Sequence, residues 1–462
     1  MNLIPQDGEY RPDPAIREIA DFIADPVAAA DFPETRLRFR NDRWAATVGL
    51  DGLSDADWCR HFGRFEPLAD NLEAPLALRY HGHQFRHYNP DIGDGRGFLF
   101  AQMRDGGGRL MDLGTKGSGQ TPWSRFGDGR LTLKGAVREI LATEMLEALG
   151  VETSKTFSVI ETGEDLHRGD EPSPTRSAVL VRLNHSHIRI GSFQRLATLG
   201  ETENLKRLVA YALRHYFGED DSGDAPLRLF RHVVAGTARM AASFMAAGFV
   251  HGVLNSDNIN ITGESFDYGP WRFAPQFDPG FTAAYFDSAG LYAFGRQAEA
   301  IHWDVAQLAI ALSGLAAEDA LIEALNGFAP AYHRALGTAM LGRLGVKPLG
   351  DAEDRALVGA VEQALVTSGT GVDRFFFDWR GGTCRAPGDY TDPGFDALRK
   401  AMAHHEPVGR DHPYWSGDAP CSMLIDEVEA IWKPIAEEDN WTVLETKVAA
   451  IRTMGEAYRC ER

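Results

Sequence analysis

The pattern of hydrophobic and polar positions changes once along the chain, from short alternating segments to long helical ones. Between residues 76 and 135, Gly-rich turns separate short alternating segments, of which GFLFAQM (97–103) and LMDLGTK (110–116) are the clearest. Alternation with a period of two is typical of strands, so these segments predict a twisted sheet. Two further strands are expected at 156–162 and 177–183.

One helix is expected inside this sheet region, at residues 131–149. Its apolar positions recur at helical spacing, and Gly150 follows as a usual C-terminal stop signal. The recurring apolar residues are Leu133, Val137, Ile140, Leu141 and Met145. We expect this helix to pack on the sheet.

From about Asn204 onward, long helical patterns dominate the chain. They cover residues 227–249, 303–316, 354–366, 422–435 and 441–454. The predicted fold class is therefore α+β, with a small mixed lobe of strands and helices followed by a larger, mainly helical lobe.

These patterns also predict where the chain divides into an N-terminal arm, a mixed lobe and a helical lobe. Residues 1–75 are Pro-rich and acidic at their start and are expected to form an arm and helices that wrap the body, with one helical piece at 15–23. Residues 76–200 are assigned to the mixed lobe and residues 201–462 to the helical lobe.

Composition and charge exclude several classes of protein. Hydrophobic residues make up 44% and charged residues 24%, which argues against disorder and fibrous repeats. A net charge of −19 opposes binding to nucleic acid and to anionic lipid, so any phosphate site must be a local basic island. No apolar run approaches the roughly 20 residues that span a bilayer. We therefore expect a cytoplasmic protein with no nucleic-acid or membrane partner.

The first candidate chemistry is that of a phosphate-binding cleft. Gly93, Gly95 and Arg96 combine a Gly-rich turn with a cation just before a strand. Lys116 ends a predicted strand, and Glu139 follows 23 residues later on the predicted helix, so the two could pair and direct the lysine toward phosphates. Each feature taken alone is more typical of an ordinary turn or of a surface ion pair.

Two further segments add groups of the same kind. A second turn, TPWSRFGDGR, supplies Asp128 and Gly129 and repeats the GDGR of the first. The segment VRLNHSHIRIG carries Arg182 and Arg189, whose guanidinium groups suit two-point phosphate contacts. Both arginines could instead pair with some of the chain's 66 carboxylates.

The sharpest local signal is FVHGVLNSDNINITGESFDYGP, at residues 249–270. Asp257 and Asn258 are followed nine to ten residues later by Asp267 in an Asp-Tyr-Gly triplet, with a short hairpin expected between them. This resembles the catalytic and metal-binding region of kinases, although no His-Arg-Asp triplet is present and the Asn adjoins the Asp. Turn chemistry is the alternative, but Lys116 and Glu139 upstream in kinase order favour the functional interpretation.

Other chemistries have weaker support. A zinc site could draw on His81, His83, His87, His185 and His187. No accompanying Cys or HExxH spacing supports it, so packing or hydrogen bonding is favoured. The chain has no GxSxG nucleophile motif and no P-loop pattern. The four cysteines form no CxxC, and we expect reduced thiols.

Taken together, several long motifs between about residues 76 and 310 resemble the selenoprotein O family. They are YHGHQF, GDGRGFLF, DLGTKGSGQTPWSRFGDGR, LKGAVREILATEML, SHIRIGSFQ, GFVHGVLNSDNINI and DYGPWRFAPQFDPG, in this order. The resemblance implies a protein-kinase-like two-lobed fold that binds ATP in a flipped orientation, exposing the α-phosphate. It also implies transfer of AMP to hydroxyl side chains of proteins.

The resemblance assigns roles to matching residues. Lys116 would hold phosphates and pair with Glu139, Asp257 would be the base, and Asn258 and Asp267 would bind Mg²⁺ or Mn²⁺. The other residues expected to line the nucleotide are Gly93, Gly95, Arg96, Asp128, Gly129, Arg182 and Arg189. The C-terminal YRCER has no second cysteine nearby, so a redox latch is not expected and Cys460 is interpreted as a free thiol.

Three functions remain open at this point. The first is protein adenylyl transfer to Ser, Thr or Tyr hydroxyls, self-modification included, by a monomer that uses ATP and a divalent metal. The second is ordinary phosphoryl transfer by the same residues, as in a protein kinase. The third is an ATP-binding scaffold without turnover.

Overall fold

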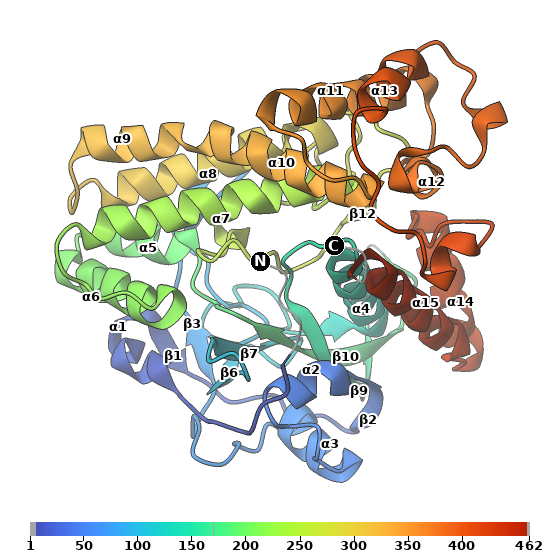
Figure 1. Cartoon of the computed structure of the whole chain (residues 1–462). Coiled ribbons are helices and arrows are strands. Elements are labelled where there is room, and N and C mark those ends of the chain that lie inside the picture. The colour runs from blue at the N-terminus through green and yellow to red at the C-terminus, as the bar shows by residue number, and fades with distance from the viewer. Residues whose placement is uncertain (1–5, 170, 460–462) are drawn as a thin grey trace.

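The computed structural model describes residues 6–169 and 171–459. Strands gather in the N-terminal part of the chain and long helices in the C-terminal part, side by side in one molecule (Figure 1). An eight-stranded antiparallel sheet has the order β1-β3-β6-β7-β10-β9-β2, and β8 pairs with β10. Its strands are β1 (Ala24–Pro26), β2 (Arg36–Arg40), β3 (Leu76–Leu78), β6 (Leu99–Arg104), β7 (Leu110–Lys116), β8 (Leu131–Thr132), β9 (Lys155–Leu166) and β10 (Thr175–Asn184).

The strands predicted from alternation are confirmed. The segment 110–116 is β7, and those near 97–103, 156–162 and 177–183 are β6, β9 and β10, each extended or shifted by a few residues. The expected helix is α4 (Leu133–Ala148), where Thr132 caps the first turn by accepting a hydrogen bond from the Gly135 amide.

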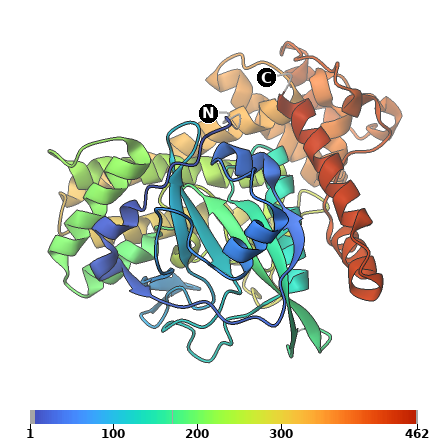
Figure 2. The same ribbon diagram turned by 90° about the horizontal axis from the view of Figure 1, so that it is seen from below.

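Both faces of the sheet are covered, which explains why β7 is buried along its whole length. Alternate side chains of β10 point to opposite faces. Val179 and Val181 join the core under α2 (Asp42–Thr47) and α3 (Asp55–Gly63), while Ala178 and Leu180 join the core under α4. Figure 2 shows α2 and α3 in front of the strands.

Residues before position 76 contribute directly to this sheet. β1 pairs with β3, and β2 pairs with β9 at one edge. The helical piece expected at 15–23 is divided into a 3-10 turn, η1 (Ala15–Glu18), and α1 (Ala20–Ile23). Two small ladders complete the strands: β4 (Gly82–Gln84) with β5 (His87–Asn89), and β11 (Phe249–Val250) with β12 (Arg272–Phe273).

The helical part is built around α7 (Ala225–Ala247), which packs against α8, α9 and α10 (Figure 1). A separate apolar cluster joins α10, α11, α12 and α13. The helices are α5 (Ile190–Thr198), α6 (Thr202–Ala212), α8 (Gln297–Leu312), α9 (Glu318–Asn326), α10 (Phe328–Leu344), α11 (Asp351–Ser368), α12 (Val372–Asp378) and α13 (Phe395–Met402). Among the described helices, none combines the length and apolar character needed to cross a membrane.

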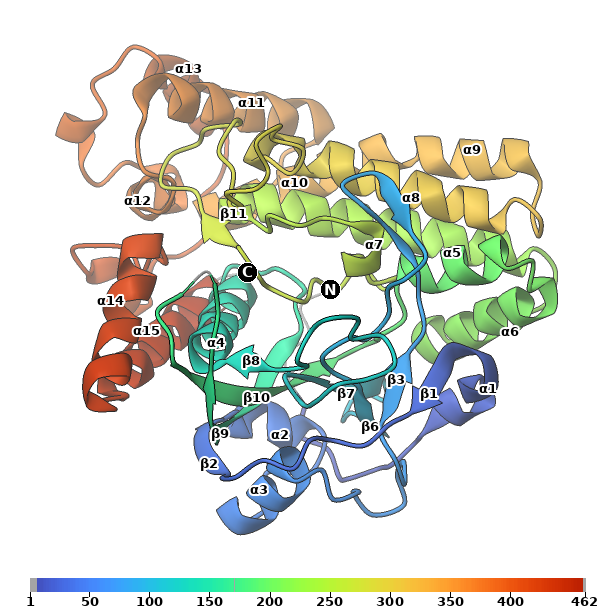
Figure 3. The same cartoon turned by 180° about the vertical axis from the view of Figure 1, so that it is seen from behind.

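The last two helices return to the sheet. α14 (Ile425–Glu438) and α15 (Thr442–Arg459) lie beside α4 in both Figure 1 and Figure 3. Arg452 of α15 forms a two-point ion pair with the buried Glu144 of α4, at 2.6 and 2.9 Å. The end of the chain therefore helps to hold α4 in place.

Candidate active site

A cavity of about 640 Å³ is lined by both GDGR loops, the ends of β7 and β10, and the segments that carry Asp257 and Asp267. Of the residues predicted from sequence, these line it: Gly93, Gly95, Arg96, Lys116, Asp128, Gly129, Arg182, Arg189, Asp257 and Asp267. Glu139 and Asn258 are outside the lining. Residues up to 174 positions apart in sequence thus meet around one space.

Lys116 lines this cavity. Its ammonium group hydrogen bonds to Glu139 of α4 and lies 2.8 Å from Asp267 Oδ1. The side chains of Lys116 and Glu139 are 5% and 1% exposed, so their attraction acts with little water to screen it. Because Glu139 fixes the lysine from the helix side, the ammonium is directed into the cavity.

Asp267 is held by cations on two sides. Besides Lys116, Arg182 Nη1 lies 3.3 Å from its Oδ1. Burial alone would raise the pKa of Asp267, but Lys116 and Arg182 hold that pKa well below its usual range. Its backbone is left-handed, with φ +63°, a conformation that is uncommon outside glycine and recurs at functional sites. Asp267 is therefore expected to be an ionised carboxylate at neutral pH.

Asp257 is in a different electrostatic environment. Burial raises the pKa of its carboxyl to about 6, and nearby Arg189 opposes that rise. Arg189 is itself fixed, because it donates to the Asp257 carbonyl at 3.1 Å and to Asp94 Oδ1 at 3.0 Å. Asp257 Oδ1 is buried without a hydrogen-bond partner in the described part of the chain. A carboxylate with a free oxygen and a raised pKa is suited to accept a proton.

Asn258 is half-buried next to Asp257, and its Nδ2 donates to the Val253 carbonyl at 3.1 Å. That bond leaves the amide oxygen available. Among the described residues, no group of three His, Cys, Asp or Glu side chains forms a metal cage. The carboxylate of Asp267, the amide of Asn258 and the unpartnered Asp257 oxygen still fit a hard ion such as Mg²⁺, which usually keeps phosphate and water ligands.

The prediction of a short hairpin between Asn258 and Asp267 is wrong. Ile259 and Ile261 pair through their backbones with residues 188–190, and Ser265 pairs with residues 152–154. Both isoleucines are fully buried, so their backbone N–H and C=O groups need hydrogen-bond partners inside the protein. Residues 188–190, which follow β10, supply these partners. The segment between the two acidic residues is thereby anchored to the sheet.

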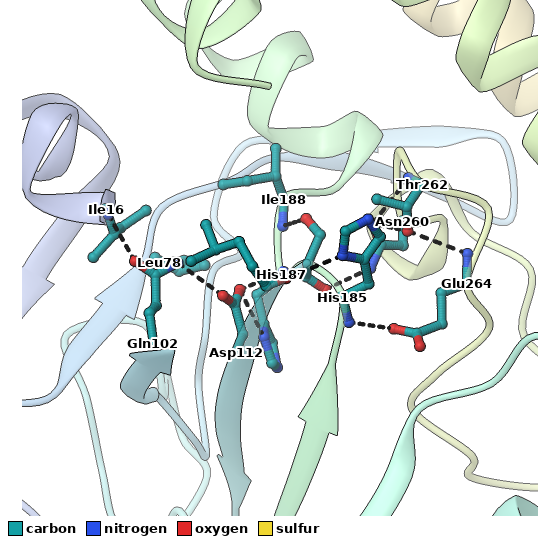
Figure 4. A network of polar contacts seen from close by, with 12 residues as sticks. Ile16, Leu78, Gln102, Asp112, His185, His187, Ile188, Asn260, Thr262 and Glu264 are labelled. Atoms are coloured by element: carbon teal, nitrogen blue, oxygen red, sulfur yellow. Dashed lines mark hydrogen bonds and ion pairs between the residues drawn. The ribbon is translucent and has the colours of Figure 1, made fainter. Parts of the chain in front are cut away.

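Figure 4 shows the polar network behind this anchor. The Asp112 carboxylate of β7 accepts hydrogen bonds from the His187 amide at 2.9 Å and from Gln102 at 2.7 Å. The Glu264 side chain accepts a hydrogen bond from the His185 amide at 2.8 Å, and Thr262 caps the Glu264 amide. These bonds join the segment between Asp257 and Asp267 to β7 and to the residues that follow β10.

Four of the five candidate zinc histidines, His81, His83, His185 and His187, take part in local hydrogen bonds. His81 bonds to the Tyr88 hydroxyl at 2.6 Å and His83 to Gln194 at 2.8 Å. The turn that contains His81 and His83 also contacts the segment that carries Asp257, because the His83 amide donates to Ser256 at 2.8 Å. Gly82 lies so close that a Cβ there would be 3.0 Å from Asp257 Cβ and Oδ1.

Sequence reasoning missed several residues at this site. Trp123 packs on the first GDGR loop, and a Cβ at position 93 would lie 2.5 Å from its ring. Only glycine therefore fits at position 93. His251 bonds to the Phe266 carbonyl at 3.0 Å and ties the two acidic segments together. Arg168 lines the cavity from a polar loop. Asp94 also lines the cavity and was missed. It could have been found from the sequence, because it lies inside the first GDGR motif.

The sheet part, the helical part and the Lys116–Glu139 pair facing Asp257 and Asp267 define an enzyme with a protein-kinase-like two-lobed fold. The family model of protein adenylyltransferase SelO matches residues 9–386. The chain belongs to the SelO family of protein adenylyltransferases and is a nucleotidyltransferase.

Relatives with curated names agree over nearly the whole chain. A protein nucleotidyltransferase YdiU of Synechocystis sp. is 42% identical over 464 residues, covering 93% of this chain and 95% of its own. The proteins of the same name from Trichormus variabilis and Synechococcus elongatus are 39% and 41% identical, over 96% and 94% of this chain and 96% and 93% of their own.

Proposed function

We propose that this protein transfers AMP from ATP to Ser, Thr or Tyr hydroxyls of other proteins, with Asp257 as the base and with Mg²⁺ or Mn²⁺ held by Asn258 and Asp267. The observation that carries the proposal is the convergence, in one cavity, of the Lys116 cation with a low-pKa carboxylate and a raised-pKa carboxylate. The net charge of −19 supports protein rather than nucleic-acid substrates.

The two carboxylates suit two roles. Asp267 stays ionised, as a metal ligand must, while Asp257 has a pKa of about 6 and can take a proton near neutral pH. The substrate hydroxyl oxygen attacks the α-phosphorus of ATP, and the bond between that phosphorus and the β-phosphate oxygen breaks. Pyrophosphate leaves, and the hydroxyl proton passes to Asp257.

The remaining groups offset charge. Lys116, Arg182 and Arg189 bring three fixed cations to a cavity that must accept a triphosphate. Because each is already held by a carboxylate or a carbonyl, little reorganisation is needed when phosphates bind. A bound divalent ion would neutralise phosphate charge and polarise the α-phosphoryl group.

The test uses ATP labelled at either the α- or the γ-phosphate, incubated with the purified protein, metal and a protein extract. The proposal expects label on protein from the α-position only, and an added AMP mass by mass spectrometry. Label from the γ-position only would instead identify a protein kinase, and no label in either case would favour an ATP-binding scaffold. Asp257→Asn should abolish transfer while retaining ATP binding.

A further inference from the structure

Arg138 of α4 and Arg272 of β12, here called the arginine pair, converge on one carbonyl oxygen, that of Trp271. Arg138 Nη2 donates to this oxygen at 3.1 Å and Arg272 Nη1 donates to it at 3.0 Å. Because both nitrogens contact the same atom, they lie within about 6 Å of each other. The Arg138 guanidinium also lies 4.8 Å from the centre of the Trp271 ring. Two like charges are thus held side by side by neutral groups.

Neither guanidinium of the arginine pair forms an ion pair with a carboxylate in the described part of the chain. Glu139, next to Arg138 in sequence, is bonded to Lys116 instead. The charge of Glu429 acts on both arginines, but its carboxylate is paired with Lys134 at 2.7 Å. The carboxylates of the surroundings are therefore committed to other cations.

A second pair of arginines in the molecule is held differently. Arg38 and Arg176 each form ion pairs with both Glu161 and Asp439, at 2.6 to 3.0 Å, so two carboxylates neutralise two guanidinium groups. In the arginine pair the two charges repel each other. Burial, together with this neighbouring charge, lowers the pKa of Arg138 to about 10. An anion that contacted both guanidinium groups would relieve the repulsion.

The arginine pair has donors left for such an anion. In the described hydrogen bonds Arg138 uses only Nη2 and Arg272 only Nη1, so Nε and the second terminal nitrogen of each remain available. Both side chains are half-buried and can be reached from solvent. Guanidinium groups match oxyanions with two-point contacts, and a tetrahedral dianion supplies several acceptor oxygens and two charges for two cations. Neither arginine lines the active-site cavity, so the pair is a separate site.

The position of the arginine pair connects it to the active site. Arg138 directly precedes Glu139 on α4, and Arg272 follows Asp267 by five residues. Lys116 joins Glu139 to Asp267 from inside the cavity. An anion bound to the arginine pair would join the same two parts of the chain from outside it.

We propose that the arginine pair is a binding site for a phosphate-type dianion, and that the bound anion holds α4 against the segment that follows Asp267 and thereby raises the rate of transfer. The effect on rate rests on the proposed function, whereas binding of the anion does not. Inorganic phosphate and a phosphate carried by a serine side chain share the chemistry that the site recognises.

The test measures thermal unfolding during titration with inorganic phosphate or O-phosphoserine, at constant ionic strength and with Mg²⁺ and α,β-methylene-ATP present to fill the active-site cavity. We expect a saturable rise in the unfolding temperature of the wild type, and the ligand that acts at the lower concentration identifies the preferred source of phosphate. Arg272→Gln should weaken the apparent affinity about tenfold, equivalent to about 1.4 kcal/mol, and Arg272→Lys should be intermediate. A rise that persists in full in Arg272→Gln would overturn the proposal.

Arg385→Gln is the matched control. Arg385 also donates to backbone carbonyls, those of Trp415 and Gly417, and lies over the Phe377 ring, but it shares neither carbonyl with another arginine in the described bonds. The control should keep the wild-type response to phosphate. If the arginine pair served only to hold the loop, Arg138→Gln and Arg272→Gln would lower the unfolding temperature without phosphate and leave the response to phosphate intact.

The effect on rate is tested by α-label incorporation at saturating ATP. Phosphate that only competes with ATP in the cavity raises KM and leaves kcat unchanged. Phosphate bound at the arginine pair should raise kcat of the wild type and not that of Arg272→Gln. An unchanged wild-type kcat would overturn the coupling to α4. If neither α- nor γ-label reaches protein, the proposed function fails, while the unfolding titration still decides whether the arginine pair binds phosphate.

Discussion

The ammonium of Lys116 lies 2.8 Å from Asp267 Oδ1 while it also hydrogen bonds to Glu139. One buried cation thereby connects α4, the sheet and the segment that follows Asp257. Among the described interactions, Lys116 is the only residue that contacts both Glu139 and Asp267. Displacement of α4 would therefore move Lys116 and disturb its contact with Asp267. The position of α4 therefore affects how Lys116 and Asp267 are arranged in the cavity.

Replacing Glu139 with Gln should lower kcat/KM for AMP transfer by about tenfold or more, because Lys116 would lose the carboxylate that directs it. Initial rates of α-label incorporation measure this. Glu203→Gln is the control, since Glu203 also pairs with a lysine, Lys206, but lies exposed on α6 and outside the cavity lining. A larger loss of activity in the control than in Glu139→Gln would contradict the prediction.

Replacing Asp267 with Ala should remove the stabilisation by ATP that requires metal. At a ligand concentration of 100 times Kd, binding stabilises a native protein by about 2.7 kcal/mol, which thermal shift detects readily. We expect Mg²⁺ with ATP to raise the unfolding temperature of the wild type and to leave that of the variant unchanged. Asp278→Asn, an exposed position in the same segment and outside the lining, should behave like the wild type.

Replacing Gly82 with Ala should displace the base without unfolding the protein. The new Cβ would lie 3.0 Å from Asp257 Cβ and Oδ1, tighter than ordinary contact. We expect kcat to fall by about tenfold to a hundredfold, since misplacing a catalytic group by an ångström has costs of this order. Gly359→Ala in α11 is the control: nothing lies within 4 Å of its added Cβ, and alanine favours the helix. Unchanged kcat in Gly82→Ala would show that Asp257 has room to move.

Acid should weaken the ion pair between Glu147 of α4 and Arg43 of α2. Burial by itself would raise the pKa of Glu147, but Lys155 and the hydrogen-bonded Arg43 lower it to about 2. A depressed pKa gives stability that is present above the ordinary value of 4.5 and is lost as pH falls toward 2. Over that interval the carboxylate contributes at most about 3 kcal/mol.

Urea unfolding at several pH values tests this contribution. Glu147→Gln should be less stable than the wild type at pH 7, and the difference should shrink as the pH approaches 2. Glu203→Gln, which removes an exposed carboxylate paired with Lys206, should differ little from the wild type at any pH. A difference that grows toward acid would reverse the predicted sign.

Local sequence signals were sufficient for much of the sheet and for the central cation. Lys116 ends an alternating run that becomes a wholly buried strand, and Glu139 falls on the helix that follows, so their pairing follows from spacing. β2 was overlooked because its sequence, RLRFR, interleaves arginines with apolar residues. That pattern suits an edge strand, yet in an acidic, Pro-rich segment it gives little sign of belonging to a sheet.

Long-range contacts account for the other failures. The strand partners of Ile259 and Ile261 lie some 70 residues earlier, and no local pattern distinguishes that pairing from a hairpin. Arg168 lies in a polar loop, lines the cavity and pairs with Asp128, 40 residues earlier. Neither residue type nor spacing reveals such a contact. Asp94 was within reach, because it lies between the two glycines that were singled out.

The packing of α14 and α15 against α4 has a consequence for how the enzyme matures during synthesis. The helix that carries Glu139 is translated long before the helices that brace it, because Arg452 follows Glu144 by 308 residues. A growing polypeptide still held by the ribosome lacks that brace. We therefore expect catalytic competence to appear only after translation is nearly complete, which would protect neighbouring nascent chains from premature modification.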